Sequence, residues 1–243
     1  MLTLFKREIR NFLSSLIGYI VIVVFLLING LFIWVFPIDY NILENGYANI
    51  DGLFTLAPYV FLFLIPAITM RSFAEEKRSG TIELLMTKPL TDLNVVLAKY
   101  FAGVVLVLFS LLPTLIYFLT VYFIGNSIGN IDIGGTWGSY IGLLFLGAAF
   151  VSIGLFASTI SDNQITSFII ALFLCGFIYI GFDFIYQLPI FTNSTLLIQS
   201  LGISIHYNSI SRGVIDTRDI IYFLSLITIF ILLSKLSLES RKW

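Results

Sequence analysis

The sequence has few of the residues on which soluble enzymes and disulfide-linked domains depend. Its 243 residues include one cysteine and one histidine, and 11% of the residues are charged. The lone Cys175 cannot form an intrachain disulfide or a cysteine-based zinc site. The lone His206 cannot build a metal site, which needs several ligands. Because the chain also has no G-x-x-x-x-G-K-[ST] loop to hold nucleotide phosphates, we expect it to bind no cofactor or metal and to catalyse no reaction itself.

Apolar side chains dominate what is present. Hydrophobic residues make up 58% of the chain, and the mean hydropathy is +1.01. A soluble domain carries about 25% charged residues, so this composition predicts an integral membrane protein. The net charge of −1 offers no electrostatic basis for binding nucleic acid.

Six apolar stretches are long enough to cross a membrane, which takes roughly 20 helical residues. They cover residues 16–36, 53–70, 100–124, 137–160, 164–187 and 219–235. Pro113 predicts a kink in the third span. The fourth is rich in glycine and alanine, which let helices approach closely in lipid, so we expect it at the centre of the packing. The fold class is therefore an all-α integral membrane protein, a single transmembrane domain over residues 1–243.

The first 15 residues predict an amphipathic helix that lies on the membrane surface and contacts lipid. Lys6, Arg7 and Arg10 supply its polar side. Its apolar residues recur at helical spacing and are Leu2, Phe5, Ile9, Phe12 and Leu13.

Charge is concentrated between the second and third spans. Residues 71–99 hold nine charged side chains, and each would cost roughly 2.5–3.5 kcal/mol at the bilayer centre, so this segment must lie in water. Thr81 is a good N-cap for a short helix that must end before Pro89, and Thr91-Asp92 cap the next apolar run. Such a helix lies on the membrane surface or fits a groove in a partner. The alternative is a plain solvated turn between two spans.

Residues 73–100, FAEEKRSGTIELLMTKPLTDLNVVLAKY, resemble the first cytoplasmic loop of type-2 ABC transporter permeases. In that family this pattern forms the coupling helix that docks on an ATPase subunit. The residues that fall on the pattern are Glu75, Glu76, Gly80, Thr81, Glu83, Leu84, Leu85 and Pro89. The resemblance implies an ABC ATPase partner that binds ATP and Mg, and a second permease copy or a related permease. The whole chain is most similar to the permease subunit associated with bacterial gliding motility, which implies the inner membrane.

The basic residues predict the orientation. Eleven of the thirteen lysines and arginines fall on one side if the N-terminus is cytoplasmic, and the other side holds Arg212 and Arg218. Because cytoplasmic loops carry an excess of lysine and arginine, both termini are expected in the cytoplasm.

Residues 188–217 form an outer segment that is too long for a turn and too polar for a seventh span. Residues 206–223, HYNSISRGVIDTRDIIYF, resemble the region where short helices re-enter the membrane in the same permease family. The candidate residues here are His206, Arg212, Gly213 and Asp216. We expect His206 to be a hydrogen-bonded loop histidine, and we expect Arg212 to pair with Asp216 four residues later.

Asp183 is the one carboxylate inside an apolar span, near the outer end of the fifth. An ionisable residue in a membrane is a functional candidate by default, although a carboxylate near the interface also meets water or a helix end. Two other functions stay open, an ATP-independent secondary transporter or channel and a structural anchor of a larger machine. Secondary transporters usually carry ionisable residues near the midplane and internal repeats, and these spans are nearly free of charge.

Overall fold

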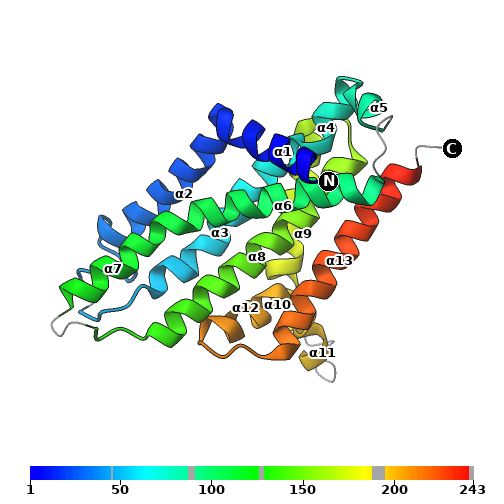
Figure 1. The fold of residues 1–243 in the computed structure, drawn as a ribbon. Coiled ribbons are helices and arrows are strands. Elements are labelled where there is room, and N and C mark those ends of the chain that lie inside the picture. The colour runs from blue at the N-terminus through cyan, green and yellow to red at the C-terminus, as the bar shows by residue number, and fades with distance from the viewer. Residues whose placement is uncertain (45, 87–90, 126–128, 188–194, 241–243) are drawn as a thin grey trace.

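A computed structural model gives the structure of the chain and describes residues 1–44, 46–86, 91–125, 129–187 and 195–240 (Figure 1). Helices dominate this part of the chain. In order they are α1 (Leu2–Ser14), α2 (Leu16–Trp34), α3 (Asp51–Thr69), α4 (Arg71–Arg78), α5 (Thr81–Met86), α6 (Asp92–Leu111), η1 (Leu112–Thr114), α7 (Leu115–Ile124), α8 (Ile133–Ile160), α9 (Gln164–Gly176), η2 (Phe177–Gly181), α10 (Phe182–Ile185), α11 (Thr195–Gln199), α12 (Ile203–Ser211) and α13 (Thr217–Glu239).

Six helical stretches in the described residues are long and apolar enough to span a membrane. They cover residues 16–34, 51–78, 92–124, 133–160, 164–185 and 217–239, which confirms the all-α membrane fold. The third begins eight residues earlier than its apolar run, because the Thr91 hydroxyl accepts the Asn94 N–H and starts the helix in the charged segment, as predicted. The second continues almost unbroken from α3 into α4, since Met70 between them keeps helical dihedrals.

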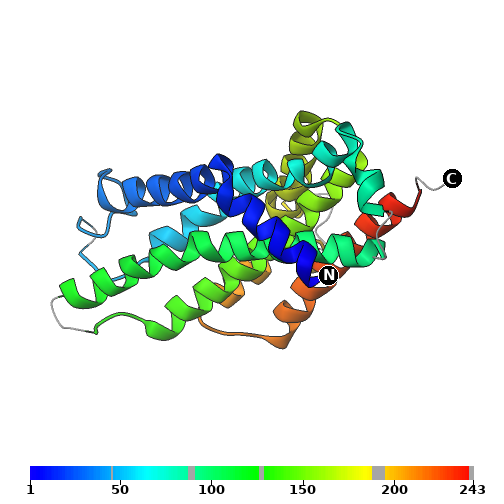
Figure 2. The same ribbon diagram turned by 45° about the horizontal axis from the view of Figure 1, so that its top comes forward.

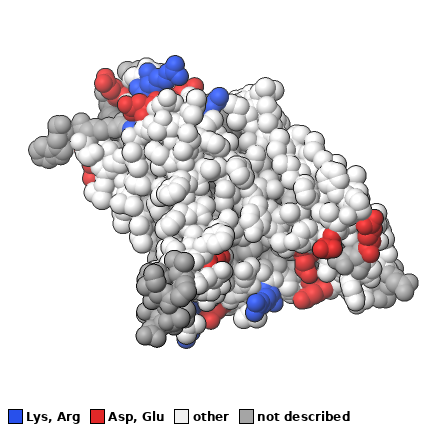
Figure 3. Space-filling view, turned by 180° about the vertical axis from the view of Figure 1, so that it is seen from behind, with Lys and Arg blue, Asp and Glu red and all other residues white. Residues whose placement is uncertain are grey.

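The two ends of the bundle differ in content. Figure 1 shows the start of α1, α4, α5 and the last turns of α13 at one end, with α11 and α12 toward the other. We call these the α5 end and the α12 end. Between them the surface is largely uncharged, and the charged side chains gather at the two ends in the view of Figure 3.

α8 lies at the centre of the packing, as its small residues predict. In an apolar stretch of 18 residues within α8, 78% of the residues are buried inside the bundle. The corresponding buried share in the other five spans is 17–61%. Gly142, Gly147 and Gly154 of α8 sit against side chains of neighbouring helices. A Cβ on Gly154 would overlap the Thr69 hydroxyl of α3, and one on Gly147 would lie 2.6 Å from a Val107 methyl of α6.

Two spans depart from regular α-helix. Pro113 lies in the short 3₁₀ segment η1 that separates α6 from α7, which is where the sequence predicts a kink. The fifth span passes from α9 into the π-helical turn η2 and then α10. No sequence signal indicated this turn, which leads directly to Asp183. Single π-helical turns often occur at functional sites.

Candidate functional site

α4 is fixed to the central helix by a serine from a distant part of the chain. The Phe73 and Ala74 N–H groups both donate to Ser158 Oγ, at 2.8 and 3.1 Å, and this oxygen lies 3.2 Å from the Met70 carbonyl. The first N–H groups of a helix have no partner within it. Ser158 of α8 therefore satisfies the start of α4 and holds it against the α5 end of α8.

A cluster of four charged side chains joins α4 to α1 and α6. This charge cluster consists of Arg7, Glu8, Glu76 and Lys99. Lys99 Nζ lies 2.9 Å from Glu76 Oε1 and 3.7 Å from Glu8 Oε1, and Arg7 donates to the same Glu8 oxygen at 2.7 Å. The Lys99 side chain is 2% exposed, so two carboxylates compensate for a cation removed from water.

Further contacts of Lys99 fix its position. Its ammonium donates to the Ser72 carbonyl at 2.7 Å and lies 5.0 Å from the centre of the Phe73 ring. Both partners are in α4, whereas Lys99 is in α6. Figure 2 shows α1 lying across the start of α6, which brings Glu8 to the same place.

A second ion contact ties α4 to the turn after α8. Lys77 pairs with Asp162 at 3.4 Å and donates to the Thr159 carbonyl. The same carbonyl accepts a hydrogen bond from Ser237 of α13, at 3.2 Å. Helices α4, α8 and α13 therefore meet at one point.

Some of the residues that fall on the family pattern contact the rest of the bundle, and others are exposed to solvent. Glu76 is in the charge cluster, whereas Glu75, Thr81 and Glu83 are exposed. Gly80 has φ +70°, a left-handed conformation that favours glycine, and it turns the chain from α4 into α5. Leu84 and Leu85 are in α5, but their side chains, like all of Pro89, lie outside the described residues.

Thr81 is the first residue of α5 and does not precede it as an N-cap. Its hydroxyl lies 2.9 Å from Ser79 Oγ and 3.4 Å from the Glu76 carbonyl. The hydroxyl therefore braces the turn between α4 and α5.

In α1, Lys6, Arg7 and Arg10 are exposed, and Leu4 and Glu8 are buried. A groove of about 360 Å³ runs between α1 and α4, with Glu75, Glu76, Thr81 and Lys99 among its lining residues. Arg7 and Glu8 connect its two walls through Glu76 and Lys99.

Sequence reasoning did not single out Glu8, Lys99, Ser158 or Asp162. A signal was available for Glu8, because it lies four residues from both Leu4 and Phe12, within the apolar stripe of α1. Ser158 and Asp162 gave no such signal, since their partners lie more than 80 residues away.

At the α12 end, His206 is hydrogen-bonded as predicted, but it lies in a helix and not in a loop. Its Nδ1 is 2.7 Å from Asp219 Oδ1, its Nε2 is 2.9 Å from the Ser200 carbonyl, and its ring stacks on Tyr222 with centroids 3.9 Å apart. The helix forms because Ile203, Tyr207 and Ile210 share one buried face of α12 at helical spacing.

The predicted Arg212–Asp216 pair does not form among the described residues. Gly213, with φ +81°, turns the chain between them, so the two side chains are not neighbours on one helix face. Asp216 instead caps α13, where its carboxylate accepts the Arg218 N–H at 3.0 Å. This backbone hydrogen bond lowers the pKa of Asp216 from its ordinary value.

Gly213 also packs closely against the start of α8. A Cβ there would lie 3.0 Å from the Gly135 nitrogen, and a Cβ on Gly138 would lie 2.7 Å from the Gly213 Cα. Asp183, in α10, is half-buried and lines a cavity of about 710 Å³ at the α12 end.

A protein-family model described as ABC-2 family transporter protein matches residues 2–243. No curated protein matches this sequence significantly. The family match covers nearly the whole chain, and six spanning helices agree with it. The chain therefore belongs to the ABC-2 transporter family and is a multi-pass membrane permease subunit of an ABC transporter, whose partner is an ABC ATPase subunit.

Proposed function

We propose that this permease is part of an exporter in the bacterial inner membrane and that its α5 end receives the ATPase in the cytoplasm. The observation that carries the proposal is the contrast between two groups of residues in the segment 71–99, one exposed and one bonded to the rest of the bundle. Glu75, Thr81 and Glu83 are exposed, whereas Glu76, Lys77 and Lys99 connect α4 to the rest of the bundle. In the topology predicted from the sequence, eleven of the thirteen lysines and arginines fall on the same side of the membrane as residues 71–99, which supports the cytoplasmic placement of this side.

The mechanism is mechanical coupling. ATP and Mg bind in the partner, and closure of the ATPases displaces α5. The displacement reaches α3 directly, because α4 continues the helix of α3. It reaches α8 through Ser158 and reaches α1 and α6 through Lys99. A second bundle, from another copy or a related permease, completes the path across the membrane.

The work done by the complex is either export of a solute or conformational work, as in gliding motility. The likeness of length and sequence to the gliding-associated permease supports the second role. Measuring whether ATP hydrolysis in the purified complex depends on an added substrate separates the two.

The docking assignment is tested with Glu83→Lys, which reverses an exposed charge on α5. We expect less ATPase to co-purify with this variant in mild detergent, with no change in the thermal stability of the permease. Glu239→Lys is the control, because Glu239 is a partly exposed carboxylate at the same end, on α13; it pairs with Lys235 at 3.4 Å, so this variant also shows the effect of losing an ion pair there. Equal recovery of the ATPase with wild type and Glu83→Lys would exclude α5 as the docking element.

A further inference from the structure

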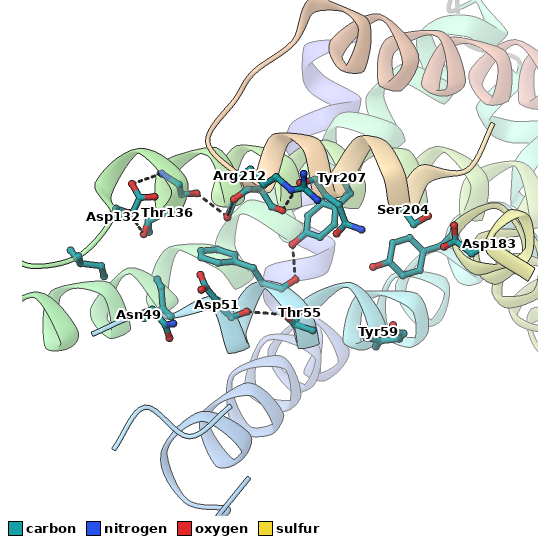
Figure 4. Close-up of a pocket in the computed structure, with 18 of the residues that line it drawn as sticks. Asn49, Asp51, Thr55, Tyr59, Asp132, Thr136, Asp183, Ser204, Tyr207 and Arg212 are labelled. Carbon is teal, nitrogen blue, oxygen red and sulfur yellow. Dashed lines mark hydrogen bonds between the residues drawn. The ribbon is translucent and has the colours of Figure 1, made fainter. Parts of the chain in front are cut away.

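A large polar cavity opens at the α12 end, between α3, α8, η2, α10 and α12. It has a volume of about 710 Å³, and a neighbouring cavity of about 750 Å³ shares Asp183, Ser204, Asn208 and Arg212 with it. Figure 4 shows Asp132 and Asp183 toward opposite ends, with Tyr207 between them. Most of its lining side chains are polar, in a chain with 11% charged residues.

Some of these polar groups form hydrogen bonds that join the helices around the cavity. The Tyr207 hydroxyl donates to the Phe54 carbonyl at 2.6 Å and joins α12 to α3. Ser139 of α8 donates to the Ser211 carbonyl at 2.8 Å, and Asp132 caps α8 by accepting the Gly135 N–H. These bonds hold the cavity walls in place.

Two residues of the lining are largely buried and carry hydroxyls that hold no wall in place. Tyr179 is 7% exposed and Ser204 is 9% exposed, and both line the cavity. In the part of the chain that the structure describes, neither hydroxyl has a hydrogen-bond partner. Neither oxygen is among the fully buried side-chain atoms that lack a partner, so both hydroxyls are accessible from the cavity and can bond to a ligand there.

The charge of the lining selects the ligand. Asp51, Asp132 and Asp183 contribute three carboxylates, and Arg212 contributes one guanidinium, so the lining carries two more negative than positive groups. A cavity of this sign attracts cations and repels anions. The rings of Tyr59 and Tyr179 meet edge to face at 5.9 Å and add aromatic surface of the kind that binds ammonium groups.

We propose that this cavity binds a hydrophilic organic cation, one that carries an ammonium group together with hydroxyl groups. The ammonium group lies near Asp183, and the hydroxyl groups of the ligand bond to Tyr179 and Ser204. Binding depends on the cavity alone, whereas a role for this ligand as the exported substrate rests on the proposed function. The same chemistry is available from a free amino compound or from the headgroup of an aminophospholipid.

The test uses three sugars with the same ring and different charge. Full-length permease in phosphatidylglycerol nanodiscs, without ATPase, is titrated with glucosamine, glucose and glucuronate at mildly acidic pH and equal ionic strength, and binding is followed by saturation-transfer NMR. We expect glucosamine to bind about tenfold more tightly than glucose, and glucuronate to bind most weakly, because opposite charges attract across a partly desolvated cavity.

Variants locate the binding. Asp183→Asn should weaken glucosamine binding about tenfold and leave glucose binding unchanged, because it removes charge and keeps the side-chain shape. Tyr179→Phe, which removes one hydroxyl, should weaken both. Glu44→Gln is the control, since Glu44 is an exposed carboxylate outside the cavity lining. The thermal stability of each variant is measured alongside.

Equal affinity for glucosamine and glucose would overturn the proposal, as would glucosamine binding unchanged in both Asp183→Asn and Tyr179→Phe. Adding phosphatidylethanolamine to the nanodiscs shows whether the bound ammonium compound is a lipid headgroup or a soluble amine. Competition with glucosamine would support a lipid headgroup as the occupant, and no competition would support a soluble amine. Because the ATPase is absent, failure of the α5 docking proposal does not alter any of these results.

Discussion

At the scale of single residues, Lys99 is the side chain at the α5 end whose loss we expect to destabilise the fold most. Replacing it with methionine leaves the Glu8 and Glu76 carboxylates close together without the buried cation between them. Removing one partner of a buried ion pair typically costs about 3–5 kcal/mol. We expect Lys99→Met to lower the free energy of unfolding by about 3 kcal/mol in detergent, measured by chemical denaturation.

A double-mutant cycle tests whether this loss comes from the pair. Lys99→Met combined with Glu76→Gln should lose less than the sum of the two single changes, because the second removes a carboxylate that the first leaves unpaired. Strict additivity would show that Lys99 stabilises the protein through its Ser72 and Phe73 contacts instead.

At the α12 end, His206 joins two elements through its side chain, as Lys99 does at the α5 end. Both ring nitrogens face oxygen acceptors, so His206 connects Asp219 of α13 to the Ser200 carbonyl. His206→Phe keeps an aromatic ring beside Tyr222 but leaves Asp219, which is 5% exposed, without this partner. Leaving a buried polar group unsatisfied costs about 1–3 kcal/mol. We therefore expect His206→Phe to lower the free energy of unfolding by about 1–3 kcal/mol and to speed amide hydrogen exchange in α12. An unchanged exchange rate in α12 would contradict this role.

At the scale of helices, the close packing of α8 against α3 predicts that residue 154 must be small. A Cβ on Gly154 would overlap the Thr69 hydroxyl of α3, so Gly154→Ala forces the two helices apart or displaces Thr69. Overpacking of this kind costs about 1–3 kcal/mol. We expect a lower melting temperature in detergent.

Gly176→Ala is the matched control for this variant. It is also a glycine in a spanning helix, but its new methyl group would meet Leu62 at an ordinary 3.9 Å. Equal melting temperatures for the two alanine variants would show that the α3–α8 contact is not limited by the size of residue 154.

The helices also show which features the sequence could predict. The six spans, the Thr91 cap and the break at Pro113 depend on neighbours within a few residues, so composition and local pattern were enough. The Ser158 cap of α4 and the Glu8–Lys99 contact join segments more than 80 residues apart, which no local pattern encodes. The Arg212–Asp216 pair was wrong because the turn at Gly213 overrides helical spacing.

At the scale of the whole molecule, the two ends are connected through α3 and α8, which reach both the charged segment and the polar cavity. The turn between α4 and α5 is then the point where force from the ATPase enters. Gly80 holds this turn at φ +70° with no atom within 4 Å of its missing Cβ. A Cβ there meets no neighbouring atom, but a β-branched valine at positive φ is strained, and we expect this strain to change the direction of α5.

Gly46 provides a close control, because it has the same φ of +70° and the same open surroundings away from the charged segment. Gly80→Val and Gly46→Val therefore carry the same local strain, of roughly 1–2 kcal/mol. We expect only Gly80→Val to abolish the stimulation of ATP hydrolysis by the permease, measured in nanodiscs that hold the complete complex. Loss of stimulation in both variants would indicate that general instability is responsible, and loss in neither would show that the direction of α5 does not control coupling.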